Sequence, residues 1–525
     1  MSLNVTVHET YDYMVREYPD FPFTRYNGRE ITFAQASARA NRLANALIAA
    51  GCGKGERLAV LSKNSDEMAI IFLAASRCGA VPVAINYRLA PQEWAYIVND
   101  SQARVLIGRN DDLVQALDTV RDTLACQVLL ADNCVAPDGW SSYDEFLSSS
   151  TTEQPQVNIS PEDTFYQLYT SGTTGHPKGV EITNANIVAY TQQCTQSLPY
   201  RVSPGDSVLV VVPMYHAAGA LTSISTHMGG GCLAIHEDAN PAEIVRAMDE
   251  DGVVATSLVP ALIQFCLGVE GIASRRFEKL RFISYGASAI APHTLSQALE
   301  TFGCDFLQGF GMTETTAATT MLLAPDHVRA LNGRPELLKS AGRPMIGSQI
   351  RIVDEQRQPV ATGTIGEIAL KGPQVMKGYW NLPEKTAETL VDGWIYTGDA
   401  GRLDEEGYLY IEDRIKDMVI SGGENIYPRE VENILIEHPQ ILDVAVIGIP
   451  DDKWGEVPMG ILVCADGTAP DPDELIAFCR KRTAGYKIPR RFAFIDILPR
   501  NPSGKILKTV LRKQFHPKTT IGTSA

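Results

Sequence analysis

The sequence predicts an α/β protein with a large N-terminal domain of layered α/β sheets, a small β-rich subdomain and a small mobile α+β C-terminal domain. Helical and strand patterns alternate through residues 32–307. Short strands with glycine-rich turns and little helix follow from residue 342, and a mixture of helix and strand begins again beyond residue 416. Strands that alternate with helices favour largely parallel sheets covered by helices.

The first elements show this alternation most clearly. Residues 32–50 carry apolar positions at helical spacing, with Thr32 as a candidate N-cap and Gly51 as a stop signal. Residues 57–61 are a short strand, and residues 67–78 are a helix that Gly79 ends. The pattern predicts further strands at residues 81–85, 104–107, 207–212, 253–259, 281–285 and 305–307.

The later elements are shorter and set the predicted domain boundaries. Strands at 349–353, 366–371 and 408–411 indicate a β-rich subdomain, residues 342–413, within an N-terminal domain of residues 1–413. We expect a hinge at 414–416. The C-terminal domain, residues 417–525, then contains helices at 428–437 and 471–482 and strands at 443–449, 460–465 and 491–497.

Composition limits the class of protein. A chain of 525 residues is too long for one core. A net charge of −16 argues against a nucleic-acid partner. There is no apolar run of about 18 residues to span a membrane, and the first residues do not form a secretory signal. The ten cysteines are scattered without a Cys-x-x-Cys pair, so we expect reduced thiols and a cytoplasmic location.

One segment carries most of the functional information. Residues 169–180 read Tyr-Thr-Ser-Gly-Thr-Thr-Gly-His-Pro-Lys-Gly-Val and follow an apolar run that resembles a strand end. Glycines let a backbone approach phosphate oxygens, while N–H groups, hydroxyls and a lysine bind them. This is not a Walker A loop, because Gly179 follows Lys178. The phosphate-binding candidates are Thr170, Ser171, Gly172, Thr173, Thr174, Gly175 and Lys178.

The segment resembles the phosphate loop of the adenylate-forming superfamily, which includes acyl-CoA synthetases, peptide-synthetase adenylation domains and beetle luciferases. Four further segments resemble motifs of that family and occur in the family's order. The resemblance covers about residues 165–510 and is closest to fatty-acyl-CoA synthetases. These segments are Gln308-Gly309-Phe310-Gly311-Met312-Thr313-Glu314, Tyr396-Thr397-Gly398-Asp399, Asp413-Arg414-Ile415-Lys416-Asp417 and Asn501-Pro502-Ser503-Gly504-Lys505-Ile506.

The resemblance implies a nucleotide site. Glu314 would bind Mg²⁺, which prefers carboxylate oxygen, and Thr313 would contact the α-phosphate. Asp399 and Arg414 would bind the ribose. The catalytic set is Lys505, Thr313, Glu314 and Lys178. The adenine would lie among Gly286, Ala287, Ser288, Gly309, Phe310 and Gly311.

The resemblance also implies a moving C-terminal domain and a thiol acceptor. Lys505 would reach the carboxylate and the α-phosphate during adenylation, and Lys416 would be the hinge residue. Gly422 and Gly423 resemble the segment beside the pantetheine channel of CoA ligases. The chain ends soon after Lys505, which leaves no room for a carrier domain in the same chain and favours free CoA over a peptide-synthetase module.

The acyl pocket is less determined by the sequence. His216 resembles a gate beside the carboxylate. Small residues suggest a channel with room for a medium or long aliphatic chain, or equally for an aromatic or polycyclic acid. The pocket candidates are His216, Ala217, Gly219, Gly309 and Ala317.

These observations together predict an AMP-forming acyl-CoA synthetase, an acid-thiol ligase that uses ATP, Mg²⁺ and coenzyme A. Its expected substrate is a medium- or long-chain fatty acid. One alternative is an aryl or specialised carboxylate-CoA ligase. An alternative of another class is a catalytically silent nucleotide- or lipid-binding homologue, against which the joint presence of Lys505, Glu314 and Asp399 argues. The expected partners are small molecules, and we also consider a homodimer.

Overall fold

The computed structural model describes residues 5–170, 177–286, 290, 292–421, 424–451, 453–465, 467–500 and 506–515. The chain divides into two compact units. The first unit comprises Met1–Gln349 and Leu370–Ile395, and the second comprises Ile350–Ala369 and Tyr396–Ala525. The boundaries and the hinge expected from the sequence stay predictions.

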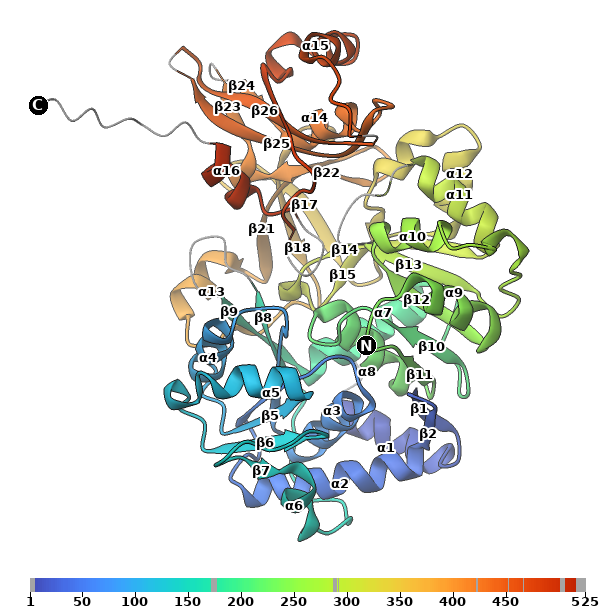
Figure 1. Ribbon diagram of the computed structural model, residues 1–525, viewed down its shortest axis with the longest axis vertical. Helices are drawn as coiled ribbons and strands as arrows, with labels where there is room; N and C mark the ends of the chain where they lie inside the picture. The colour runs from blue at the N-terminus through green and yellow to red at the C-terminus, as the bar shows by residue number, and fades with distance from the viewer. Residues whose placement is uncertain are drawn as a thin grey trace, which may run out of the picture. The chain divides into compact units, whose positions relative to one another are not determined.

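A parallel sheet of five strands belongs to the first unit (Figure 1). Every residue of the three strands at one end is buried, as expected where helices cover both faces. Leu61, Val83 and Leu106 pack with α4 (Pro91–Asp100) and α5 (Asp111–Asp118) on one face. Residues on the other face pack with α2 (Phe33–Ala49) and α3 (Asp66–Cys78). The strand order is β4 (Val81–Ile85), β3 (Arg57–Leu61), β5 (Val105–Arg109), β6 (Val128–Asp132) and β7 (Ser141–Ser142).

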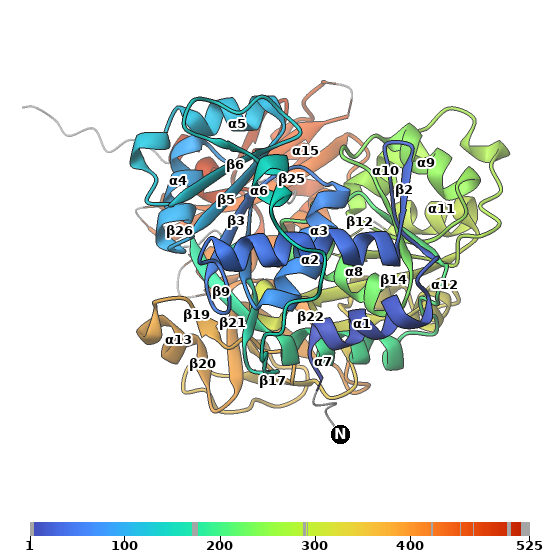
Figure 2. The ribbon, with the colours of Figure 1, turned by 90° about the horizontal axis from the view of Figure 1, so that it is seen from below.

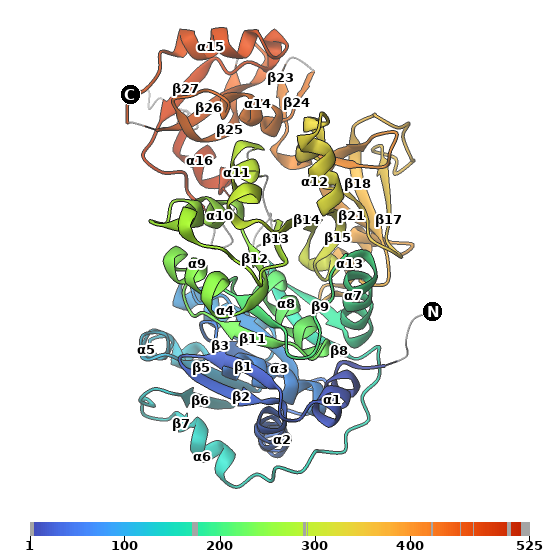
Figure 3. The same cartoon turned by 90° about the vertical axis from the view of Figure 1, so that its right-hand side faces the viewer.

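A sheet of nine strands forms the other large layer of the first unit. Its central strands are parallel, and antiparallel strands lie at both edges. Figure 3 shows α9 (Pro241–Glu250), α10 (Pro260–Leu267) and α11 (Pro292–Phe302) next to one another beside this sheet. The order is β16 (Arg343–Pro344), β15 (Ala318–Leu322), β14 (Asp305–Gly311), β13 (Phe282–Gly286), β12 (Val253–Leu258), β10 (Ser207–Val210), β11 (Cys232–Ile235), β1 (Pro22–Tyr26) and β2 (Arg29–Thr32).

Helix α3 is central to the core of this unit. All 13 of its residues are buried, because it packs against α2 on one side and α8 (Ala217–Met228) on another (Figure 2). Its charged residues are buried in ion pairs, such as Arg77 with Asp12 at 2.7 Å. Ser65 caps the start of the helix, and Gly79 ends it in the left-handed region at φ 74°.

The third sheet is a hairpin with one added strand. β8 (Thr164–Thr170) and β9 (Lys178–Thr183) pair antiparallel, and β19 (Gly378–Tyr379) pairs with β9. This added strand is distant in sequence and brings residues near 379 to the predicted phosphate loop. The unit also contains the α-helices and the strand α1 (Val7–Glu17), α6 (Tyr143–Ser148), α7 (Asn184–Ser197), α12 (Ala324–Leu331), α13 (Pro383–Thr389) and β20 (Leu390–Val391).

The second unit contains two groups of strands. One group has all or most of its residues in this unit. It consists of β17 (Gln349–Val353), β18 (Gly366–Lys371), β21 (Trp394–Leu403) and β22 (Leu409–Arg414), of which β22 lies wholly in the unit and pairs with β21. The C-terminal sheet has the order β24 (Glu424–Ile426), β23 (Val419–Ser421), β26 (Gly455–Cys464) and β25 (Ile441–Asp451), and β27 (Arg491–Phe494) also pairs with β26.

The C-terminal sheet has an apolar cluster on each face. Val444 and Val446 pack with α14 (Pro428–Leu435) and α15 (Pro472–Arg480), whereas Ala445 and Ile447 pack with α16 (Lys508–Phe515). Alternate residues of one strand point to opposite faces, so both faces are covered from a single apolar run. The predicted fold class, a large α/β part followed by a small α+β part, is confirmed. No helix in the described ranges is both long and apolar enough to cross a membrane.

Candidate active site

The β8–β9 hairpin carries the two ends of the predicted phosphate loop. Thr170 is the last residue of β8 and Lys178 is the first of β9, and these two residues are paired across the hairpin. The structure therefore brings a threonine and a lysine together at one end of the sheet. The other loop candidates, Ser171, Gly172, Thr173, Thr174 and Gly175, lie outside the described residues.

Glu314 is a buried carboxylate held by a tyrosine. It lies in a short 3-10 helix, η3 (Thr313–Thr315), shortly after β14, and is only 6% exposed. The hydroxyl of Tyr379 donates a hydrogen bond of 2.7 Å to Glu314 Oε1. Burial, and secondly the negative charge of Glu314, raise the pKa of Tyr379, so this hydroxyl stays protonated and donates.

Tyr379 also links Glu314 to the phosphate loop. The Lys178 ammonium lies 4.2 Å from the centre of the Tyr379 ring, a cation–π contact. We call Lys178, Glu314 and Tyr379 the Glu314 cluster. Sequence reasoning missed Tyr379, because 65 residues separate it from Glu314. The pairing of β19 with β9 brings them together, and no local pattern signals such a pairing.

The donor set of the Glu314 cluster fits Mg²⁺. No group of three or more His, Cys, Asp or Glu side chains able to hold a metal ion occurs among residues with a described placement. A zinc site needs three or four such ligands. Mg²⁺ instead binds one or two carboxylates together with phosphate oxygens and water. A single buried carboxylate beside the predicted phosphate loop fits this requirement.

The predicted adenine residues gather at the carboxyl ends of two neighbouring strands. Gly286 ends β13 and pairs with Gly309 in β14, and Phe310 and Gly311 follow directly. In open α/β sheets, ligands bind outside the carboxyl ends of the strands. Thr313 then lies at the start of η3, beside Glu314. Ala287 and Ser288 are outside the described residues, and adenine binding stays a prediction.

The two predicted ribose ligands are partners in the second unit. Asp399 in β21 pairs with Arg414 at the end of β22, and Arg414 Nε lies 2.6 Å from Asp399 Oδ1. Asp399 is only 7% exposed. Its backbone N–H donates to the hydroxyl of Thr397 at 3.1 Å, and that hydroxyl donates to the carbonyl of Ile368 at 2.8 Å. This network fixes the carboxylate on rigid strands.

The acyl-pocket candidates differ in their surroundings. His216 directly precedes α8, which begins at Ala217, and its Nε2 atom is buried without a hydrogen-bond partner in the described part of the chain. Burial, and then the positive charge of Arg88, lower the pKa of His216 to about 4. The imidazole is therefore neutral near pH 7. Its Nε2 atom is therefore a neutral hydrogen-bonding group that the described residues leave unsatisfied.

The two glycines of the predicted pocket, Gly219 and Gly309, have different surroundings. A Cβ on Gly219 would meet the backbone of Val212 and Pro213, so a glycine is needed for α8 to approach that loop. A Cβ on Gly309 would instead meet side chains, Ala318 Cβ at 3.1 Å and Met321 Sδ at 3.7 Å. Side chains can define a pocket wall. Ala317 lies between η3 and β15 and is half-buried.

The hinge and the thiol-side residues are only partly described. Lys416 lies in a 3-10 turn, η5 (Ile415–Asp417). Asp417 of this turn pairs with Arg512 of α16 at 2.8 Å. Just before the turn, Asp413 lies 3.7 Å from Lys508. The catalytic candidate Lys505 and the CoA candidates Gly422 and Gly423 are outside the described residues.

Comparisons with known proteins agree with this fold. Residues 12–380 match the family described as AMP-binding enzyme, and residues 430–505 match the AMP-binding enzyme C-terminal domain. The feruloyl-CoA synthase of an Amycolatopsis species is 37% identical over 499 residues, 95% of this chain and 96% of that protein. The fatty acid–[acyl-carrier-protein] ligase ScoC of Streptomyces coeruleorubidus is 34% identical over 516 residues, 97% and 96% of the two chains.

A solved structure extends the agreement to three dimensions. A fatty acyl CoA synthetase of Mycobacterium tuberculosis superposes with a TM-score of 0.77 and 32% identity, over 97% of this chain and 98% of that one. The chain belongs to the AMP-binding enzyme family, among its AMP-forming acyl- and aryl-CoA ligases. The predicted family resemblance and enzyme class are confirmed.

Proposed function

We propose that this protein is an ATP-dependent acyl-CoA ligase that activates a carboxylic acid as acyl-AMP and transfers the acyl group to CoA. The observation that carries the proposal is the Glu314 cluster. It combines a buried carboxylate, a tyrosine that orients it and a lysine at the end of the phosphate-loop hairpin. Such a set suits the binding of a nucleoside triphosphate with its metal ion.

The first half-reaction needs positioning and charge stabilisation. A carboxylate oxygen of the substrate attacks the α-phosphorus of ATP, the bond to the β-phosphate oxygen breaks, and pyrophosphate leaves. Lys178 and Lys505 would stabilise the developing negative charge. Mg²⁺, when bound at Glu314, would neutralise phosphate charge. Tyr379 holds the Glu314 carboxylate in place for that ion.

In the second half-reaction, the thiolate of CoA attacks the acyl carbon, and AMP leaves with the electron pair of the broken C–O bond. The thiol proton goes to solvent. Gly422 and Gly423 are the proposed lining of the thiol channel, and rotation near Lys416 is proposed to exchange Lys505 for this segment. The ScoC relative is named for an acyl-carrier-protein acceptor, so a carrier thiol in place of free CoA is an outcome that the assay must separate.

The leading substrates are medium- or long-chain fatty acids. An aryl acid is the alternative, supported by the feruloyl-CoA synthase relative at 37% identity. His216 is the proposed gate beside the carboxylate, since its neutral Nε2 lacks a partner in the described part of the chain. All ten cysteines are free thiols, which supports the expectation of a reducing, cytoplasmic environment. A homodimer stays a prediction.

Pyrophosphate release with a panel of acids tests the proposal. The panel contains fatty acids of 6 to 18 carbons and hydroxycinnamic acids, each assayed with Mg²⁺·ATP and with CoA or a phosphopantetheinylated carrier protein. We expect pyrophosphate release with the fatty acids and acyl-CoA detected by mass spectrometry. Equal or faster turnover of the aryl acids would establish the alternative. Binding of ATP without pyrophosphate release from any acid would indicate a silent homologue.

A further inference from the structure

One turn of helix α4 holds both ends of the predicted phosphate loop. Asp100 Oδ2 accepts a hydrogen bond of 2.5 Å from the hydroxyl of Tyr169, the residue before Thr170. The hydroxyl of Tyr96 lies 3.3 Å from the carbonyl of Pro177, the residue before Lys178, and 3.4 Å from Asp100 Oδ1. Tyr96 and Asp100 are four residues apart and share one face of the helix.

The same turn is attached to the strand that carries Tyr379. The indole N–H of Trp380 donates to the backbone carbonyl of Asp100 at 3.0 Å. The Arg57 guanidinium stacks 3.4 Å from the centre of the Trp380 ring and pairs with Glu181 of β9 at 3.0 Å. Asp100 therefore contacts two segments, which lead to Thr170 and to the Glu314–Tyr379 pair. The third segment, which leads to Lys178, is reached through the hydroxyl of Tyr96, which lies within hydrogen-bond distance of Asp100.

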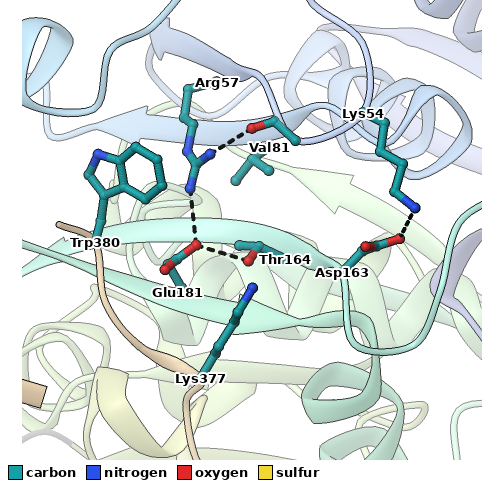
Figure 4. A pocket seen from close by; sticks show the side chains of 9 residues that line it. Lys54, Arg57, Val81, Asp163, Thr164, Glu181, Lys377 and Trp380 are labelled. Carbon is teal, nitrogen blue, oxygen red and sulfur yellow. Dashed lines mark hydrogen bonds and ion pairs between the residues drawn. The ribbon is translucent and has the colours of Figure 1, made fainter. Parts of the chain in front are cut away.

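Figure 4 shows the charged groups beside Thr164 of β8 and Glu181 of β9, in a pocket of about 430 Å³. The carboxylate of Glu181 is bound by Arg57 and by the hydroxyl of Thr164. Asp163 pairs with Lys54 at 2.8 Å. Both carboxylates of this pocket are therefore paired with a cation, and these ion pairs brace the hairpin.

We propose that Asp100 is a positioning residue for ATP, which holds the two stems of the phosphate-loop hairpin and the Tyr379 strand in the arrangement that binds the triphosphate. The inference rests on the proposed function, since it needs the hairpin to bind ATP. Hydrogen bonds to a charged carboxylate are short and about twice as strong as neutral ones. Among the described residues, Asp100 forms no hydrogen bond or ion pair with a substrate-binding candidate, so it acts through Tyr169 and Trp380.

The phenol of Tyr169 is suited to this role. Burial, followed by the hydrogen bond and the charge of Asp100, raise its pKa. The hydroxyl therefore stays protonated at every pH at which the enzyme is assayed. It also accepts a hydrogen bond from Gln167 Nε2 at 3.2 Å, which fixes its orientation.

Two conservative variants of the full chain test the proposal, Asp100→Asn and Tyr169→Phe. Asp100→Asn removes the charge of the acceptor and Tyr169→Phe removes the donor, so each abolishes the charge-assisted hydrogen bond while nearly keeping the side chain's size. We expect the dissociation constant for ATP, measured by calorimetry, to rise about tenfold in each, as for one hydrogen bond to a charged group. The KM for the carboxylic acid should stay within twofold of the wild-type value. The urea concentration at the midpoint of unfolding should stay close to that of the wild type. The double variant should be no weaker than either single one, because both remove the same bond.

Gln92→Ala is the matched control, since Gln92 is exposed on the same helix. It should bind ATP like the wild type. An unchanged ATP affinity in folded Asp100→Asn and Tyr169→Phe would overturn the inference and leave the proposed function intact. A parallel loss of ATP affinity, acid affinity and stability would also overturn it, because the role would then be structural. Failure of the wild type to bind ATP would overturn the proposed function and this inference together.

Discussion

Replacing Tyr379 by phenylalanine tests the Glu314 cluster most directly. The change removes one hydroxyl, which donates a hydrogen bond of 2.7 Å to the carboxylate of Glu314, a residue that is only 6% exposed. A hydrogen bond to a charged group contributes about 1.5–3 kcal/mol, which corresponds to roughly 10- to 150-fold in a binding constant. Loss of a group that orients a metal ligand lowers metal affinity or activity by a similar 10- to 100-fold.

The assay is pyrophosphate release as a function of Mg²⁺ concentration at saturating ATP. We expect Tyr379→Phe to need about tenfold or more additional Mg²⁺ for half-maximal rate. The aromatic ring remains over Lys178, so the KM for ATP should change less than in Tyr379→Leu, which removes the ring as well. An unchanged Mg²⁺ requirement in folded Tyr379→Phe would refute the assignment of Glu314 as the metal ligand oriented by this hydroxyl.

Four further outcomes follow from the same reasoning. Lys505→Ala should slow adenylation by about 10²- to 10³-fold but spare thioester formation from supplied acyl-AMP; equal losses would contradict a two-pose mechanism. Gly309→Trp should shorten the accepted chain, because its side chain would press on Ala318 and Met321; an unchanged chain-length profile would remove Gly309 from the pocket wall. Lys416→Pro should fix φ near roughly −65° and let bound acyl-AMP accumulate in a single turnover, whereas wild-type acyl-CoA turnover would exclude a hinge there. Burial lowers the pKa of His227 from 6.5 to about 3, so the contribution of the neutral imidazole to stability is present above pH 6.5 and is lost as the pH falls toward 3. The free energy of unfolding in urea should therefore decline less over this range in His227→Gln than in the wild type, and an equal decline would show that His227 does not cause the loss of stability.

Local signals predicted the elements whose ends are set by their own residues. Thr32 caps α2 by accepting a hydrogen bond from the backbone N–H of Gln35, and Gly79 ends α3 with φ 74°, both as the sequence indicates. Strand β14 extends to Gly311, beyond the predicted end at residue 307. The glycines there weaken the strand signal, and pairing with β13 and β15 supplies the hydrogen bonds that the local sequence does not reveal.

The parts of the site that depend on distant contacts were not predictable in the same way. Asp399 and Arg414 were each proposed as ribose ligands, but their direct ion pair depends on the register of β21 and β22. The sequence signals neither Tyr379 nor Asp100 as a site residue. Their roles arise where β19 joins β9 and where α4 meets the hairpin, and a single sequence contains no spacing that signals either meeting.

The surroundings of two glutamates in the first unit separate a structural charge from a functional one. Glu181 is paired with Arg57 at 3.0 Å and accepts a hydrogen bond from Thr164 at 3.0 Å, so its charge is compensated by the protein. Glu314 is more deeply buried, yet no lysine, arginine or histidine of the described ranges forms an ion pair with it. Lys178 lies over the ring of Tyr379, the residue that donates to Glu314.

A buried carboxylate without a cationic partner is costly to a fold unless a ligand supplies the missing charge. A tyrosine hydroxyl orients such a group but does not neutralise it. The contrast with Glu181 therefore supports the proposal that the charge partner of Glu314 is a metal ion that arrives with ATP. On this reasoning Glu314→Gln should bind ATP with a reduced dependence on Mg²⁺, whereas a structural role for the carboxylate would leave that dependence unchanged.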